Sequence, residues 1–325
     1  MNIKLNSYLK EKPAWTQLLI FGGITAIITF IATALGFVIV AKLNGFHASA
    51  LSGLQQDDFA QPQYAGIVKG LLVVQFFGVF FFPSMLFAYL ADPKPLKFAG
   101  LKKPDRSNSI VLTVIIILFS YLMVSWMSAL NQKIVQNIFG KAAQAWIEKG
   151  ESEVNGMLKN ILDMHNASDL IESIVLVGLL AAVGEELFFR GILQRIFIQV
   201  FKNPWAGILV TAAIFSAVHG QFLGFIPRWV LGIILGSLYW YSGSLWTSIV
   251  GHFVFNSVPI ILVYYKQSDF TEQKGGPDAS LTILGVIGTV IVIALIGYLR
   301  KNSLTTYAKV YETIKRDFTD FPDRP

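Results

Sequence analysis

The sequence predicts an all-α fold, a polytopic bundle of about eight transmembrane helices with both termini in the cytoplasm. Three observations lead to this fold class. First, 54% of the 325 residues are hydrophobic and only 14% are charged, whereas soluble domains carry about 25% charged residues. Second, apolar segments of about 20 residues, the length that crosses a membrane, recur along the chain. Third, Lys and Arg gather in alternate loops between these segments.

Eight apolar segments are long enough, or nearly long enough, to cross a hydrocarbon core of about 30 Å. They are residues 15–41, 70–91, 110–130, 170–200, 205–220, 222–241, 245–265 and 281–299. The first is longer than the apolar core of a signal peptide, which has about 7–15 residues, so we expect an uncleaved span. The fifth and sixth are short, and only the residues around Gly220 separate them.

The distribution of basic residues predicts the orientation of the bundle. With the N-terminus inside, the inner loops and both termini hold 17 of the 26 Lys and Arg residues. Cytoplasmic loops of membrane proteins carry such an excess. Both termini inside requires an even number of spans. We attribute the net charge of +6 to cytoplasmic anchoring, and we expect no nucleic-acid partner.

Three regions follow from this pattern. Residues 1–169 supply the N-terminal helices and an outer loop, 131–169, with an amphipathic helix. Residues 170–265 form a helical core that we expect to be catalytic, for the reasons below. Residues 266–325 supply the final span and a charged cytoplasmic tail. The chain has no cysteine, which excludes disulfides, thiolate zinc sites and a cysteine nucleophile.

Ionisable residues are rare in the predicted spans, and most of those present form one group. The fourth span contains Glu185 and Glu186, followed by Arg190, and the fifth and seventh spans contain His219 and His252. Charged groups inside a membrane are costly and usually mark a functional site. These five residues are therefore the first candidates for chemistry.

Helical spacing divides the candidates into two sets. Glu186 and Arg190 are four residues apart and share a helix face, and a buried carboxylate needs such a partner. Glu185 points about 100° away from Glu186, so we expect it to be free for chemistry or for another partner. His252 and Asn256 are also four residues apart and share a face.

Depth in the membrane supports a single cluster. With a rise of about 1.5 Å per residue, Glu185 lies roughly 12 Å, His219 roughly 18 Å and His252 roughly 11 Å from the inner boundary of the core. The three residues therefore converge from three helices at a similar depth. We expect an intramembrane site that lies nearer the cytoplasmic side.

The spacing of these residues resembles the three-motif pattern of the CPBP family, the CAAX prenyl endoprotease and bacteriocin-processing intramembrane proteases, also called the Abi family. The resemblance covers about residues 170–260. Three motifs carry it, in order and on separate spans: Glu185-Glu186-x-x-x-Arg190, Phe215-x-x-x-His219 and His252-x-x-x-Asn256.

The resemblance implies an intramembrane endopeptidase. By analogy, Glu185 and His219 activate a water molecule, His252 and Asn256 stabilise the oxyanion, and Glu186 with Arg190 supports the site. The residues agree with this chemistry, because peptide hydrolysis needs a base for the water and donors for the oxyanion.

The metal dependence of the reaction is left open by the residues. Glu185, His219 and His252 would be the ligands if a metal such as Zn²⁺ were bound, with water in the fourth position. The chain has no H-E-x-x-H helix of the zinc proteases. The resemblance favours a glutamate-dependent mechanism in which no cofactor is obligatory.

Two other classes of function are alternatives. One is a catalytically idle scaffold or immunity protein, since such roles occur in this family. The other is a proton-coupled transporter, which would place ionisable residues in both halves as inverted repeats; here they lie in the second half only. We expect a multi-pass protein of a bacterial cytoplasmic membrane. Its predicted partners are membrane lipids and a membrane-associated peptide or protein substrate, prenylated or of the leader type.

Overall fold

The computed structural model describes residues 8–47, 53, 56–266 and 277–312, and every regular element in these ranges is helical. The fold is therefore all-α, as predicted. The α-helices before the site are α1 (Ala14–Leu43), α3 (Ala65–Gln75), α4 (Phe82–Ala91), α5 (Pro95–Phe98), α6 (Ser109–Ile138) and α7 (Lys141–Ile161). Those that follow are α8 (Ala167–Ser173), α9 (Ala181–Glu186), α10 (Gln194–Phe201), α11 (Pro204–Ala217), α12 (Phe225–Ser242), α13 (Leu245–Lys266) and α14 (Ala279–Lys301).

Six helical stretches in the described ranges are long and apolar enough to cross a membrane, which makes this an integral, multi-pass membrane protein. They are Ala14–Leu43, Pro62–Ala91, Ser109–Ile138, Ala167–Phe201, Leu245–Lys266 and Ala279–Lys301. Each coincides with a predicted span. The predicted fifth and sixth spans are α11, a shorter apolar helix, and α12, which is not among the six. The count of eight spans therefore stays a prediction.

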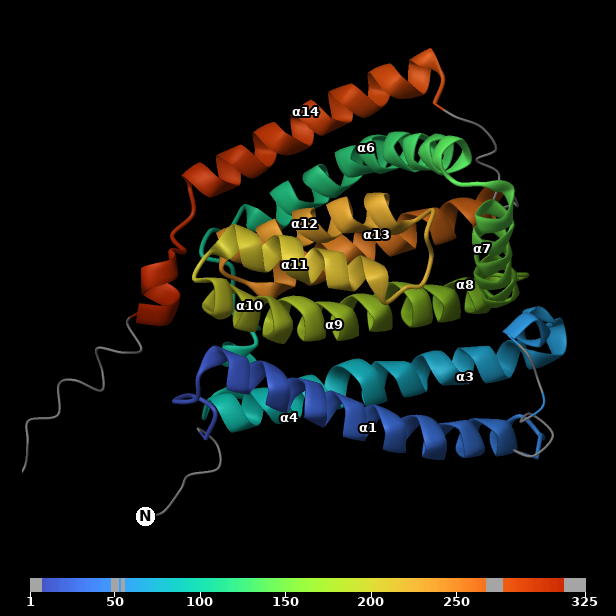
Figure 1. Ribbon diagram of the computed structural model, residues 1–325, viewed down its shortest axis with the longest axis horizontal. Helices are drawn as coiled ribbons and strands as arrows, with labels where there is room; N and C mark the ends of the chain where they lie inside the picture. The colour runs from blue at the N-terminus through green and yellow to red at the C-terminus, as the bar shows by residue number, and fades with distance from the viewer. Residues whose placement is uncertain (1–7, 48–52, 54–55, 267–276, 313–325) are drawn as a thin grey trace, which may run out of the picture.

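The long helices run roughly parallel to one another in layers (Figure 1). Helices α14 and α6 pack together on one side, α11, α12 and α13 fill the middle, and α1, α3 and α4 lie on the other side of the α8–α10 stretch. Both described ends lie at one end of the bundle, because Leu9 donates to the carbonyl of Leu90 and Tyr311 donates to the carbonyl of Arg195. Which side of the membrane this end faces stays a prediction, as does the cytoplasmic tail, whose residues 313–325 lie outside the described ranges.

Helix α7 crosses the opposite end of the bundle, nearly at right angles to the long helices (Figure 1). It lies in the predicted outer loop and has one exposed face, with Trp146 73% exposed, and one buried face that includes Ile147. The preceding helix α6 continues eight residues beyond the predicted end of its span at residue 130. At about 1.5 Å per residue its 30 residues are longer than a hydrocarbon core of about 30 Å, so part of the helix extends beyond such a core.

Two π-helical segments, η5 (Ile174–Leu180) and η6 (Leu187–Leu193), flank the short helix α9. A third, η4 (Phe76–Phe81), packs against α9. Gly184 permits this contact, because a Cβ atom there would lie 2.8 Å from the ring of Phe76. π-helical turns are frequent at functional sites, and here they flank both glutamates of the first motif.

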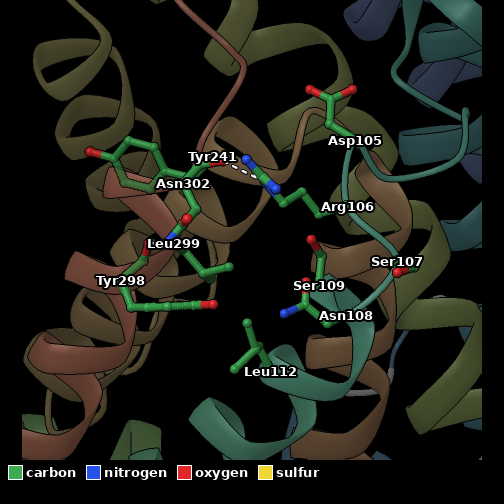
Figure 2. Close-up of a pocket in the computed structure, with 10 residues that line it drawn as sticks. All are labelled: Asp105, Arg106, Ser107, Asn108, Ser109, Leu112, Tyr241, Tyr298, Leu299 and Asn302. Atoms are coloured by element: carbon green, nitrogen blue, oxygen red, sulfur yellow. Dashed lines mark hydrogen bonds between the residues drawn. The ribbon is translucent and has the colours of Figure 1, made fainter.

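A polar pocket of about 360 Å³ opens at the end of the bundle that holds both described chain ends (Figure 2). It lies where the start of α6 meets the end of α14. Arg106 donates from Nε to the carbonyl of Asn302 across it. The remaining lining residues are Asp105, Ser107, Asn108, Ser109, Leu112, Tyr241, Tyr298 and Leu299.

Candidate active site

Glu186 is the centre of a closed polar network in the middle of the bundle. Its side chain is fully buried, and Oε1 accepts from Nη1 of Arg190 at 2.6 Å and lies 2.8 Å from Nδ1 of His252. Its other oxygen accepts from the hydroxyl of Ser248. The ion pair predicted from the i, i+4 spacing is therefore present, and two residues of α13 complete its partners.

Arg190 is held on three sides. It is 0% exposed, and Nη1 donates to Glu186 while Nη2 donates to the carbonyl of Gly232 at 3.2 Å. Its guanidinium carbon lies 4.4 Å from the centre of the Phe215 ring, a cation–π contact that gains strength away from water. The pair with Glu186 thus joins η6 to α11 and α12 as well as to α13.

Glu185 faces the open side of the site. Its Oε2 lies 3.9 Å from Nε2 of His219 and 4.0 Å from Nε2 of His252. This oxygen is enclosed by protein and has no hydrogen-bond partner. The side chains of Glu185, His219 and His252 are 12%, 31% and 5% exposed. The three residues predicted to converge from three spans do converge.

The second ring nitrogen of each histidine fixes which nitrogen faces Glu185. Nδ1 of His219 lies 2.8 Å from the carbonyl of Phe215, and Nδ1 of His252 lies 2.8 Å from Glu186. Both partners are acceptors, so each Nδ1 carries a hydrogen and donates it. Each Nε2 is therefore the atom that can take up or release a proton towards Glu185.

Asn256 lies one turn beyond His252 on α13, as its spacing predicted. Its Nδ2 donates to the carbonyl of Val177, in the π-helical segment η5, at 3.0 Å. This bond uses one of the two hydrogens on the amide nitrogen and leaves the other. Its predicted role as a donor to the oxyanion stays a prediction.

His219 lies just past the end of α11, which ends at Ala217, and not inside a longer helix as predicted. The turn that carries it is fixed from two neighbouring helices. Asn131 of α6 donates to the carbonyl of Leu223 at 2.7 Å. Glu151 of α7 accepts from the backbone N–H of Leu223 at 2.9 Å and from the side chain of Gln221 at 3.1 Å.

The residues that would bind a metal do not form a metal-binding group as they stand. Donors that share a tetrahedral zinc at about 2.0–2.1 Å lie about 3.4 Å apart, and the oxygen of Glu185 is farther than this from both Nε2 atoms. Within the described ranges, no cluster of three His, Cys, Asp or Glu side chains is placed to hold a metal ion.

Sequence reasoning missed two partners in this site. Ser248 is four residues before His252, so the spacing that linked His252 to Asn256 would also have placed it on that face. Phe215 was recognised only as the first residue of the second motif. Its ring contacts Arg190 and lies 5.1 Å from the ring of His219 and 5.9 Å from that of His252, which only the folded arrangement of three helices shows.

Comparison with known proteins finds a family model that is similar to the part of the chain that holds this site. Residues 167–258 match the family model described as type II CAAX prenyl endopeptidase Rce1-like. This segment holds every residue of the site and lies within the predicted core of 170–265 apart from its first three residues. Residues 167–258 are thus similar to Rce1-like CAAX protease domains, which confirms the predicted resemblance and supports an intramembrane protease.

The chain is also similar to a curated bacterial protein of uncharacterised function. The chain is 27% identical over 117 residues to "Uncharacterized protein YpbD" of Bacillus subtilis (strain 168). The match covers 36% of this chain and 57% of the relative, so it spans little more than half of that protein. No solved structure matches the chain.

Proposed function

We propose that this protein is an intramembrane endopeptidase that hydrolyses a peptide bond of a membrane-associated substrate, prenylated or of the leader type, in a bacterial cytoplasmic membrane. The observation that carries the proposal is the position of Glu185. Its enclosed Oε2 has no hydrogen-bond partner and faces the Nε2 atoms of His219 and His252. A buried oxygen without a partner is costly, which is expected where a substrate or a reacting water must bind.

We place the reacting water between Glu185 and His219. The 3.9 Å between Oε2 of Glu185 and Nε2 of His219 is too long for a direct hydrogen bond but suits a bridging water that lies about 2.8 Å from each atom. In the proposed step Glu185, assisted by His219, accepts a proton from this water as its oxygen attacks the carbonyl carbon. The same proton then passes to the leaving nitrogen as the carbon–nitrogen bond breaks.

The oxyanion formed in this step needs donors on the far side of the carbonyl. His252 can donate from Nε2 only as an imidazolium, since its Nδ1 already donates to Glu186. The carboxylate of Glu186 lies beside this ring. Asn256 has its second amide hydrogen for the same oxyanion. Glu186, Arg190 and Ser248 are then positioning residues, which act through His252.

The proposed reaction needs no metal and no other cofactor. Carboxylate, imidazole and amide groups supply the base and the donors, and no step is assigned to an ion. The proposed partners are membrane lipids and a membrane-associated peptide or protein substrate. We expect no interaction with nucleic acid.

The proposal is tested by cleavage of a pool of membrane-segment peptides, with and without a farnesylated cysteine, in proteoliposomes. We expect Glu185→Gln, which keeps the shape of the side chain, to lower the cleavage rate at least 10²-fold, the lower end of the range for a general base. Glu172→Gln, on the exposed part of the same long helix, is the matched control and should cleave at the wild-type rate.

A chelator added to the wild-type enzyme tests the metal independence. Unchanged cleavage supports the proposed mechanism, and loss of cleavage that Zn²⁺ restores would show a metalloprotease. Equal rates for wild type and Glu185→Gln would contradict the role of Glu185. Two results together would favour the scaffold alternative. The folded wild-type protein would cleave no peptide, and the Glu185→Gln variant would retain the cellular effect of the wild type.

A further inference from the structure

A second cavity, of about 150 Å³, lies at the end of the bundle that holds both described chain ends. Its chemistry differs from that of the active site, because three of its lining residues are cations. They are Lys97, Lys102 and Arg195, and the other lining residues are Gly100, Ile198, Tyr239, Trp240, Gly243, Thr305, Val310 and Tyr311. None of these lining residues is acidic.

Arg195 is the deepest of the three cations and is only partly satisfied. Its Nε is enclosed by protein and has no hydrogen-bond partner, and Nη1 reaches the hydroxyl of Tyr239 only at 3.5 Å. Its guanidinium carbon lies 4.6 Å from the centre of the Phe98 ring. Among the described residues no carboxylate lies within ion-pair distance of it; Asp92 acts on it only electrostatically. An enclosed cation without a paired anion is costly.

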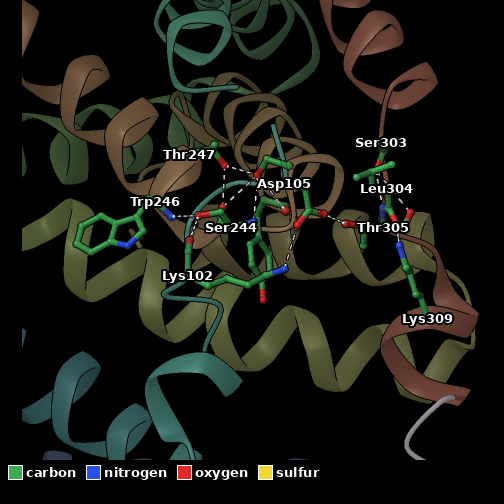
Figure 3. Close-up of polar contacts among 11 residues, drawn as sticks. Lys102, Asp105, Ser244, Trp246, Thr247, Ser303, Leu304, Thr305 and Lys309 are labelled. Atoms are coloured by element: carbon green, nitrogen blue, oxygen red, sulfur yellow. Dashed lines mark hydrogen bonds and ion pairs between the residues drawn. The ribbon is translucent and has the colours of Figure 1, made fainter. Parts of the chain in front are cut away.

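One carboxylate, that of Asp105, contacts residues that line the cavity (Figure 3). Asp105, behind the wall, pairs with Lys102 at 3.2 Å and accepts from the hydroxyl of Thr305 at 3.3 Å. This pairing accounts for one of the three cations. Lys97 and Arg195 still give the cavity a net positive charge, and concave sites of one sign concentrate counter-ions.

The cavity is separate from the candidate active site. Arg195 follows Glu185 by ten residues in the Ala167–Phe201 stretch, which corresponds to about 15 Å along a helix. An apolar cluster of Ala99, Leu187, Tyr239, Leu245 and Ile249 packs beside the cavity, and its member Leu187 directly follows Glu186. An anion at Arg195 would therefore not lie among the groups proposed to react with the peptide.

The segment after α14 closes one side of the cavity. Thr305, Val310 and Tyr311 line it, and the hydroxyl of Tyr311 donates to the carbonyl of Arg195 at 3.3 Å. Burial raises the pKa of Tyr311, so this hydroxyl keeps its hydrogen at neutral pH. An anion in the cavity would contact Arg195 beneath this segment and would hold the segment against the bundle.

We propose that this cavity binds a phosphate group and thereby fastens residues 303–311 to the bundle. Guanidinium and ammonium groups are side-chain groups that bind phosphate in proteins, and a cavity of about 150 Å³ is large enough for one phosphate group. Two sources share this chemistry: the headgroup of an anionic phospholipid of the cytoplasmic leaflet and free phosphate. The proposal does not depend on the protein being a protease.

The test is ligand-induced stabilisation of the full chain in dodecyl maltoside micelles. A ligand that binds only the folded state raises the melting temperature in a saturable way. Inorganic phosphate is compared with chloride at equal ionic strength, and dioctanoylphosphatidylglycerol with dioctanoylphosphatidylcholine. Saturation by inorganic phosphate would identify free phosphate as sufficient, and saturation by phosphatidylglycerol alone would identify the lipid headgroup. Both results support the proposal.

Variants assign the effect to the cavity. We expect Arg195→Gln to raise the dissociation constant at least tenfold, and Arg300→Gln, at an exposed arginine of α14 outside the cavity, to leave it unchanged. Lys97→Gln removes an exposed cation at the rim and should weaken binding about threefold, which provides a test if Arg195→Gln does not fold. No saturable effect beyond the chloride and phosphatidylcholine controls, or an unchanged dissociation constant in Lys97→Gln and any folded Arg195→Gln protein, would overturn the proposal.

Discussion

Glu185 and Glu186 are adjacent in the chain, yet the two sides of the site that they face differ in how fully their polar groups are hydrogen-bonded. The Glu186 side is closed: its carboxylate is fully buried and accepts hydrogen bonds from Arg190, His252 and Ser248. The Glu185 side is open: its Oε2 has no partner and faces two imidazole nitrogens across a gap. His252 belongs to both sides, with Nδ1 towards Glu186 and Nε2 towards Glu185.

This difference indicates how a bundle can keep reactive groups inside a membrane. Buried charges are tolerated where each has a partner, and the Glu186 network meets that condition with residues from α9, η6 and α13. The network fixes the ring of His252, and the hydrogen bond from Nδ1 of His219 to the carbonyl of Phe215 fixes the other ring. Both rings are therefore held without a hydrogen bond to Oε2 of Glu185.

The largest expected effect is the difference in the free energy of unfolding between the variants Glu186→Gln and Glu185→Gln. Loss of the charge on Glu186 leaves Arg190 buried without its anion, and breaking such a pair costs about 3–5 kcal/mol. We expect Glu186→Gln to lower the free energy of unfolding by about that amount, measured by SDS titration in mixed micelles with far-UV circular dichroism. Glu185→Gln should leave stability unchanged or raise it.

The double variant Glu186→Leu with Arg190→Met sharpens this prediction. Replacing both members of a buried pair by apolar residues is often neutral in stability, so this variant should unfold closer to wild type than Glu186→Gln does. It should still be inactive, because His252 loses the carboxylate that orients its ring. Equal destabilisation by Glu185→Gln and Glu186→Gln would contradict the division of the site into a closed and an open side.

A smaller effect is expected for Ser248→Ala. The hydroxyl of Ser248 supplies the hydrogen bond to the second oxygen of Glu186, and a buried acceptor left without its donor costs about 1–3 kcal/mol. We expect a loss of stability in that range and a modest fall in kcat, measured on the same peptides. Ser248→Thr keeps the hydroxyl and should recover most of both. Ser257→Ala, at a hydroxyl on the same helix without a partner, is the control and should change neither.

Much of this site could be predicted from the sequence because membrane burial makes polar residues informative. Glu185, His219 and His252 stand out in apolar segments, and the i, i+4 rule paired Glu186 with Arg190 before the fold was known. The six stretches that can cross a membrane were found from apolar length alone. These inferences need only local spacing and the cost of burying charge.

Other features depend on contacts between helices and are not encoded locally. The carbonyl of Gly232 and the ring of Phe215 meet Arg190 only after α11, α12 and η6 pack together. The amino-acid composition of the π-helical segments around α9 does not differ recognisably from that of an ordinary apolar α-helix. The end of α11 at Ala217 was missed, because the predicted span continued through His219 on apolar length.

The smallest expected effect concerns the turn that carries His219 and involves helix α7. Glu151 accepts from the N–H of Leu223 and from Gln221, and Gln221 in turn accepts from Arg228 at 2.6 Å. These bonds hold the turn from outside the catalytic core. We expect Glu151→Ala to lower kcat about three- to tenfold with little change in KM, since a looser turn places Nε2 of His219 correctly for a smaller fraction of the time.

A conservative replacement of Glu151 distinguishes a role in positioning His219 from a role in overall stability. Glu151→Gln keeps an oxygen that can accept from Leu223, so it should recover most of the kcat lost in Glu151→Ala. Glu148→Ala, at an exposed neighbour on α7, should match wild type. The contrary outcome is that Glu151→Ala lowers stability as much as Glu186→Gln does, while Glu151→Gln recovers no activity. The turn would then be part of the structural core. The Glu185 side of the site would then depend more on its surroundings than the comparison of the two glutamates indicates.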